Sequence, residues 1–220
     1  MARRGDPCDR HYLTTAVMDS FEKNLWGAGF THIAGADEVG RGALAGPVVA
    51  AAVILPKGTE NFGLRDSKKL TPQRREFLFE EIEKRAVSIG IGVVEPEEID
   101  RINILKATLK AMEIALSSLI PPPDYILIDG NQPVKSNTPQ ETIVKGDDRS
   151  LSIAAASIIA KVTRDRMMTS LHEIYPLYNF SIHKGYGTEE HRDAIDKYGP
   201  SPIHRKTFVL KQKPRQMLLL

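Results

Sequence analysis

The chain has 220 residues, of which 41% are hydrophobic and 26% are charged, with a net charge of +2. These values are typical of one substantial globular α/β domain, and the mild charge does not by itself indicate a nucleic-acid-binding protein. Cys8 is the single cysteine, which excludes an intramolecular disulfide, and no membrane-spanning run or secretory leader is expected, so a cytoplasmic protein is predicted.

The first half of the chain predicts two helices and a hairpin. Apolar positions at helical spacing predict a helix over residues 14–26, which stops at two glycines. Two apolar runs, 30–38 and 47–55, predict strands, and the glycine-rich turn between them favours a hairpin. Thr71 is suited to cap a helix over 72–85 that begins with proline.

The second half continues the alternation of strands and helices. In chain order we expect a strand, one or two helices, two short strands, a long alanine-rich helix and a short helix, over residues 86–94, 96–119, 121–129, 141–147, 150–175 and 188–198. The segment 121–129 begins with a proline-rich loop, and its strand ends at Asp129. The long helix is entirely apolar from Ile153 to Ala156, which places it in the interior. This order predicts an α/β fold with one mixed sheet flanked by helices in a single domain.

Carboxylates stand beside glycines at the ends of three predicted strands. These acids are Asp37 with Glu38, then Asp129, and then Asp147. Any one of them could instead cap a turn, which is a common role for Asp. Three strands that end this way favour a shared site, because buried acids are costly unless they are paired or bind a cation. Neighbours on a regular strand point to opposite faces, so Asp37 and Glu38 share a site only if the strand ends or twists there.

The residue types in this pattern indicate which cation would suit them. No cysteine or histidine accompanies the acids, so zinc is a poor candidate. Hard oxygen ligands favour Mg²⁺ or Mn²⁺, which complete their coordination with water and substrate phosphates. Two such ions about 4 Å apart can activate a water and stabilise the leaving oxygen of a phosphodiester. The acids therefore predict metal-dependent chemistry at a phosphate.

The turn after the first acids, Gly40-Arg41-Gly42, permits a close approach of the backbone to a ligand. Together with Gly46 it also resembles a loose dinucleotide-binding fingerprint. That motif should open a helix, whereas a strand is predicted next and no acid follows about 20 residues on. The dinucleotide interpretation is therefore disfavoured.

Six separated segments resemble ribonuclease HII, the bacterial type 2 ribonuclease H family. In chain order they are ADEVGRGALAGPVVAAAVIL, DSKKL, YILIDG, VKGDDRSLSIAAASIIAKVTRDRMM, HKGYGTEEH and SPIHRKTF. The resemblance is specific because six motifs agree in order and spacing. It covers roughly residues 20–208 and implies a ribonuclease H-like fold with a mixed five-stranded sheet. We expect a catalytic domain over 16–208, between a flexible segment at 1–15 and a basic tail at 209–220.

The resemblance also implies an activity. Members of this family are endonucleases that hydrolyse the RNA strand of RNA–DNA hybrids and cut 5′ to single ribonucleotides in duplex DNA. They use Mn²⁺ or Mg²⁺, with two ions when substrate is bound, and leave 5′-phosphate and 3′-hydroxyl ends. The metal-binding and catalytic acids would be Asp37, Glu38, Asp129 and Asp147, and only the resemblance selects Asp147 over Asp148.

Substrate-binding residues follow from the same resemblance. The backbone of Gly40, Arg41 and Gly42 would sense the 2′-hydroxyl, the group that distinguishes RNA from DNA, and Tyr186 would pack on the adjoining deoxyribose. Relatives often carry proline after this turn, where this chain has Ala43, so a slightly looser turn is expected.

Other polar residues have two possible roles. Lysines could position the duplex through its phosphates or be ordinary surface residues; they are Lys68 and Lys161, the two that we favour, with Lys69, Lys145 and Lys184. For Asp165, a structural ion pair or cap in the long helix is favoured over a catalytic role. A histidine acid/base mechanism through His183, His191 and His204 is disfavoured, because it needs no carboxylate cluster.

The expected partners are nucleic acids. The expected substrates are RNA–DNA hybrid and ribonucleotide-containing duplex, and the protein is expected to be a monomer without membrane contact. The last residues, KQKPRQMLLL, are either disordered or a peptide that binds a partner such as a replication clamp. The rival function is a catalytically silent nucleic-acid-binding module on the same fold, which the four intact acids disfavour.

Overall fold

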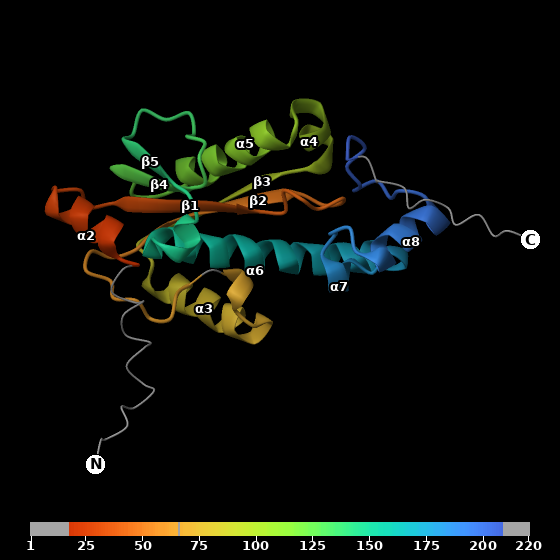
Figure 1. The fold of residues 1–220 in the computed structure, drawn as a ribbon, viewed down its shortest axis with the longest axis horizontal. Coiled ribbons are helices and arrows are strands. Elements are labelled where there is room, and N and C mark those ends of the chain that lie inside the picture. Colours follow the sequence, from red (N-terminus) through yellow and green to blue (C-terminus); the bar gives the residue numbers. More distant parts are fainter. Residues whose placement is uncertain (1–17, 66, 209–220) are drawn as a thin grey trace, which may run out of the picture.

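A five-stranded sheet forms the centre of the structure, a computed structural model that describes residues 18–65 and 67–208 (Figure 1). Its strands are β1 (Ile33–Val39), β2 (Val48–Ile54), β3 (Ser88–Val94), β4 (Tyr125–Asp129) and β5 (Gln140–Ile143), in the spatial order β3-β2-β1-β4-β5. β1 and β2 form the predicted antiparallel hairpin and β3 continues it, whereas β4 and β5 run parallel to β1. The predicted mixed sheet of five strands is confirmed.

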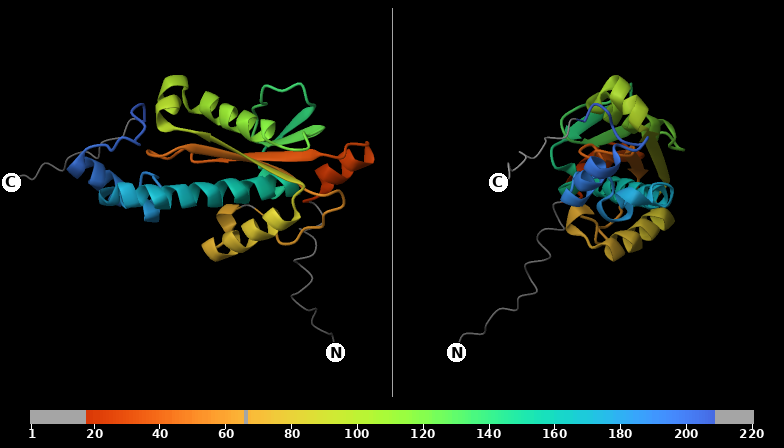
Figure 2. Two further views of the ribbon diagram at one scale, coloured as in Figure 1. Left: turned by 180° about the vertical axis from the view of Figure 1, so that it is seen from behind. Right: turned by 90° about the vertical axis from the view of Figure 1, so that its right-hand side faces the viewer.

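Helices cover both faces of this sheet (Figure 2). α6 (Leu151–Ile174) lies against one face with α3 (Pro72–Arg85) outside it, and α5 (Ile104–Ser117) lies against the other face beside α4 (Pro96–Ile102). β2 is buried along its whole length because helices cover it on both sides and strands flank it. Its alternate residues therefore enter two different apolar clusters: Ala51 packs toward α6, and Ala50 packs toward α5.

Two glycines let the helices approach the sheet closely. A Cβ atom at Gly35 of β1 would stand 2.1 Å from the backbone carbon of Ser152 in α6. On the opposite face, a Cβ atom at Gly92 of β3 would stand 1.9 Å from the carbonyl oxygen of Ala111 in α5. Only glycine leaves room for these backbones, so the two positions fix how closely each helix lies against the strands.

Shorter elements complete the chain. They are α2 (Ser20–Gly27), η2 (Ser67–Lys69), η3 (Gly146–Asp148), η4 (Pro176–Tyr178), α7 (Phe180–His183) and α8 (Glu189–Tyr198). α7 and α8 lie at the C-terminal end of α6, at the right of Figure 1. The helix predicted over 14–26 begins later than expected among the described residues, because Met18 and Asp19 form a turn and α2 begins at Ser20. Residues 14–17 and the terminal segments predicted at 1–15 and 209–220 lie outside the described residues. None of the helices that the structure describes is long and apolar enough to cross a bilayer.

The prediction that the fifth strand ends at Asp147 is wrong. β5 stops at Ile143, Val144 is exposed, and Lys145 adopts a left-handed backbone with φ of 56°. Left-handed backbone cannot continue a strand, so the chain turns into η3 before α6 begins. Asp147 therefore reaches the edge of the sheet from a 3₁₀ turn, which an apolar run in the sequence does not reveal.

Candidate active site

The ends of β1 and β4 bring the first three acids together. The two strands are parallel, and Ala36 of β1 is paired with Ile128 of β4. The next residue on each strand is an acid, so Asp37 and Asp129 stand at the same level of the sheet edge. Glu38 follows Asp37 and points toward the opposite face, since neighbours on a strand alternate.

Asp37 lies on the face that α6 covers, and it is only 5% exposed. Its Oδ1 accepts a hydrogen bond from the Glu38 N–H at 2.7 Å. Burial, followed by the charges of Glu38 and Asp129, raises the pKa of Asp37 well above its ordinary value, and a hydrogen bond with Ser157 of α6 opposes that shift. The ionised carboxylate is therefore held in a place where a cation would stabilise it strongly.

Glu38 faces α5 but reaches two hollows at the end of β1. One hollow also contains Asp129, and the other contains Asp37 and Tyr186. Burial raises the pKa of Glu38, whereas Arg41, whose Nη1 lies 3.2 Å from Oε1, opposes the rise, and Asp129 adds to it. Glu38 thus interacts with both neighbouring acids although it starts on the other face, because the strand ends one residue later.

A backbone hydrogen bond links the last two acids. The N–H of Gly146 donates to Asp129 Oδ1 at 2.6 Å, and Asp147 is the next residue. A Cβ atom at Gly146 would lie 2.6 Å from Ile153 and 3.2 Å from Asp129 Oδ1, so glycine permits this approach. Asp147 is buried, and its Oδ2 lies 3.5 Å from Lys68 Nζ.

All four acids offer hard oxygen ligands, yet they do not form a ready-made ligand set. Within residues 18–65 and 67–208, no three His, Cys, Asp or Glu side chains converge closely enough to hold an ion. The acids are instead held by their local partners, a backbone N–H, Arg41, Gly146 and Lys68. The donor chemistry fits Mg²⁺ or Mn²⁺, because three neighbouring carboxylates repel each other and a divalent cation would offset that repulsion.

A cavity of about 340 Å³ adjoins the acids on the α6 face. It is lined by Asp37, Lys68, Lys161 and Tyr186, which the structure thus brings together as predicted site residues. Lys161 Nζ lies 5.9 Å from the centre of the Tyr186 ring and 2.7 Å from Asp165 Oδ1. The structural ion pair predicted for Asp165 is confirmed.

The Gly-Arg-Gly turn follows the first two acids directly, and its Arg41 lines the hollow that also contains Glu38 and Asp129. Gly40 has a φ of +92°, and a Cβ atom there would stand 2.2 Å from Arg164 Nε, so the fold requires glycine. Gly42 is different, because a Cβ atom there would meet no atom within 4 Å. Ala43 donates its N–H to the Gly40 carbonyl at 3.3 Å and forms a β-bridge with Tyr186. A looser turn was expected because Ala43 stands where relatives often have proline. The Ala43 N–H hydrogen bond opposes that loosening, and proline, which has no N–H, could not make it.

Two buried arginines hold this turn, and the sequence interpretation missed them. Arg164 of α6 donates to the carbonyls of Pro47, Ala45 and Lys184 at 2.9, 3.1 and 2.9 Å. It therefore joins the segment after the turn to the segment before Tyr186. The sequence carries little signal for Arg164, because it stands among other polar residues of the long helix, such as Asp165 and Arg166.

Arg205 acts in the same way from the C-terminal side. It donates to the Gly46 carbonyl at 2.8 and 3.0 Å and to the Arg41 carbonyl at 3.0 Å. Burial lowers the pKa of Arg205 to about 9. Ser157, which contacts Asp37, was missed as well, and its only signal was a hydroxyl among the alanines and isoleucines of α6.

The three histidines lie elsewhere, in a buried cluster with Phe180. The rings of His183 and His191 stack at 4.3 Å, and His191 Nε2 lies 3.0 Å from His204 Nε2. None of them lines the cavity that holds Asp37. Burial lowers the pKa of all three, so they are neutral structural groups, and a histidine acid/base mechanism has no support from their positions.

The fold and this edge define an α/β protein whose acids gather at the C-terminal ends of two parallel strands. A family model described as ribonuclease HII matches residues 34–211. Ribonuclease HII of Geobacter sulfurreducens is 58% identical over 198 residues, covering 90% of this chain and 91% of that protein. Ribonuclease HII of Acetivibrio thermocellus is 56% identical over 188 residues, covering 86% and 73%.

Solved structures agree with these relatives. Ribonuclease H2 from Pyrococcus horikoshii has a TM-score of 0.67 at 30% identity, covering 80% of this chain and 93% of that one. Ribonuclease HII from Archaeoglobus fulgidus, solved as a PCNA complex, has a TM-score of 0.70 at 28% identity, covering 83% and 97%. The chain therefore belongs to the ribonuclease HII family, and it is an endoribonuclease, a hydrolase of phosphodiester bonds.

Proposed function

We propose that the protein hydrolyses the RNA strand of RNA–DNA hybrids and cuts on the 5′ side of single ribonucleotides in duplex DNA. The proposed ligands of two divalent ions, Mn²⁺ or Mg²⁺, are Asp37, Glu38, Asp129 and Asp147. The observation that carries this proposal is the mutual repulsion of buried Asp37 and half-buried Glu38 and Asp129 at the sheet edge, which a bound cation would offset.

Each part of the site has a defined task in this proposal. Bound divalent ions would supply Lewis-acid activation of water and stabilisation of the leaving 3′-oxygen. Gly40, Arg41 and Gly42 present backbone groups to the 2′-hydroxyl, and the open space beside Gly42 leaves room for a ribose. Tyr186 holds the neighbouring sugar, while Lys68 and Lys161 contact phosphates beside the acids.

Partner contacts belong to the same proposal. The Archaeoglobus fulgidus relative was solved with PCNA. A sliding-clamp contact through the basic tail at 209–220 would let this chain follow replication, although that tail lies outside the described residues. We further infer a monomer that acts in the cytoplasm, where a single cysteine stays reduced.

The decisive experiment compares two neighbouring acids. Asp147 is buried at the site, whereas Asp148 is exposed and its carboxylate lies 2.7 Å from Lys69 Nζ. A duplex with one ribonucleotide, incubated with Mg²⁺ or Mn²⁺, should be cut by the unmodified protein to 3′-hydroxyl and 5′-phosphate ends. Asp147→Asn should lower the rate by about 10³-fold or more, and Asp148→Asn should stay within about threefold.

Three outcomes would overturn the proposal. They are no cleavage with either metal, a 2′,3′-cyclic phosphate product, and equal losses of activity in the Asp147 and Asp148 variants. An all-DNA duplex of the same sequence, which should remain intact, is the control for contaminating nucleases.

A further inference from the structure

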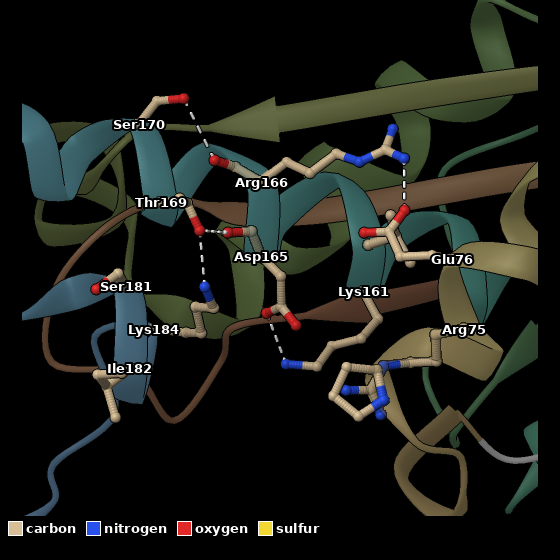
Figure 3. A pocket seen from close by; sticks show the side chains of 12 residues that line it. Arg75, Glu76, Lys161, Asp165, Arg166, Thr169, Ser170, Ser181, Ile182 and Lys184 are labelled. Atoms are coloured by element: carbon tan, nitrogen blue, oxygen red, sulfur yellow. Dashed lines mark hydrogen bonds and ion pairs between the residues drawn. The ribbon is translucent and has the colours of Figure 1, made fainter.

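A second hollow opens between α3, α6 and α7, beside the carboxylate cavity (Figure 3). Its volume is about 730 Å³, and Lys161 lines both this groove and the cavity that contains Asp37. A polymer that passes through the catalytic cavity can therefore continue into the groove. We call it the α3–α7 groove; its polar walls include Arg75, Glu76, Arg166 and Lys184.

The α3–α7 groove carries an excess of positive charge. Its two acids are already paired, Glu76 with Arg166 at 2.5 Å and Asp165 with Lys161 at 2.7 Å. Two further cations, Arg75 and Lys184, form no ion pair within the part of the chain that the structure describes (Figure 3). Uncompensated cations at the mouth of a catalytic cavity attract a polyanion.

Lys184 is held in place rather than left free in solvent. Its backbone is left-handed, with a φ of 53°, and its carbonyl accepts a hydrogen bond from Arg164 Nη1 at 2.9 Å. Its ammonium group donates to Thr169 Oγ1 at 2.7 Å across the groove (Figure 3). Partial burial lowers the pKa of Lys184, so its charge lacks full hydration and gains from an anionic partner.

The rim of the groove offers apolar contact as well. Ile182 is 69% exposed, and Pro72 at the start of α3 also lines the groove. A nucleic-acid backbone alternates charged phosphates with largely apolar sugar faces, so cations and apolar side chains together suit it better than they suit a small anion.

We propose that the α3–α7 groove binds the phosphodiester backbone of the duplex on one side of the cut, with Lys184 as its main phosphate contact and Arg75 as a second. This inference rests on the proposed function. It extends the substrate site from the cavity beside the acids into the adjoining α3–α7 groove, whose residues take no part in the cleavage itself.

The test measures binding separately from cleavage. In the Asp37→Asn background, the affinity for a ribonucleotide-containing duplex is measured as a function of salt concentration. Adding Lys184→Gln should weaken binding about 3- to 10-fold and reduce the slope of log affinity against log salt by about 0.9. Lys184→Arg should restore most of both. The matched control is Lys106→Gln, an exposed lysine of α5 on the opposite face of the sheet, which should change neither.

Trimming the duplex then locates the contact. Shortening one flank should remove the difference between the parent protein and Lys184→Gln, and shortening the other flank should preserve it. Equal salt slopes for the Lys184 and Lys106 variants, or a difference that survives trimming of either flank, would overturn the inference. Neither result depends on turnover. The proposed groove contact can therefore be disproved while the protein still cleaves its substrate, and cleavage can be absent while the groove contact is supported.

Discussion

At the scale of single residues, Asp37 shows how the site opposes the stability of the fold. Its pKa is raised by burial and by two neighbouring acids, so the ionised form that exists above that pKa is disfavoured in the folded protein. The free-energy penalty is present at neutral pH and disappears as the pH falls through the raised pKa. In the proposed function, a bound cation would offset this penalty.

Asp37→Asn should therefore stabilise the protein while it abolishes cleavage. Asn keeps the acceptor for the Glu38 N–H and removes the buried charge. In EDTA at pH 7, the free energy of unfolding should rise by about 1–2 kcal/mol, which corresponds to roughly 3–6 °C in Tm. Thermal unfolding followed by circular dichroism measures this shift.

Asp148→Asn is the control for Asp37→Asn, because Asp148 is exposed, and its Tm should not change. A lower Tm for Asp37→Asn would contradict the charge argument even if its activity were lost.

At the scale of elements, α6 carries Ser157, Lys161 and Arg164, so its placement decides the shape of the cavity. α2 anchors its N-terminus through Glu22, which is 1% exposed. Glu22 Oε1 accepts hydrogen bonds from Ser150 Oγ at 2.6 Å and from the N–H and Oγ of Ser152 at 3.0 and 2.8 Å. A carboxylate at a helix N-terminus also interacts favourably with the helix dipole.

Glu22→Ala should lower the free energy of unfolding by about 2–3 kcal/mol, because it leaves these buried donors without their acceptor. Urea denaturation at pH 7 provides the measurement. Glu83→Ala, an exposed glutamate of α3, should change it by less than about 0.5 kcal/mol. Equal effects of the two substitutions would show that the anchor contributes nothing.

The elements that the sequence predicted well are those with long apolar patterns. β2 was predicted because it is a continuous apolar run, and α6 because its apolar residues persist over several helical turns. The end of β5 was misplaced because Ile143 and Val144 continue a strand-like run, while the break depends on the left-handed backbone at Lys145. The four-residue helix α7 was not predicted, since so short a segment has no period to recognise.

At the scale of the whole molecule, contacts between distant segments complete the site. Arg205 donates to the Arg41 carbonyl in the Gly-Arg-Gly turn, and Arg164 donates to the Pro47 carbonyl in the segment that follows it, each from more than 100 positions away in the chain. The sequence placed three of the four acids at strand ends, and the family resemblance selected the fourth. Neither revealed these arginine–carbonyl contacts, because backbone acceptors carry no residue type that a pattern can detect.

The histidine cluster connects the same distant segments and has a defined proton arrangement. His191 Nδ1 lies 3.0 Å from the Tyr186 carbonyl, so Nδ1 carries the proton and Nε2 accepts from His204. His204 Nδ1 in turn accepts from the Ser201 N–H at 2.9 Å. Each ring is satisfied when neutral, and a second proton on His191 would place two N–H groups face to face.

Acid should therefore destabilise the fold through His191. Burial lowers the pKa of His191 to about 4, below the ordinary value of 6.5 that it regains on unfolding. Because the unfolded chain binds the additional proton, stability is full above about pH 6.5 and is lost as the pH falls toward 4. Between pH 7 and pH 5, His191 should lower the free energy of unfolding by an amount on the order of 1–2 kcal/mol, discounted for solvent screening.

Urea denaturation of the unmodified protein and of His191→Leu at both pH values measures this change. The variant should be less stable at pH 7, but its stability should fall less on acidification. His32→Gln, a half-buried histidine outside the cluster, should keep the full loss, and equal losses in the unmodified protein and His191→Leu would rule out His191 as the titrating group.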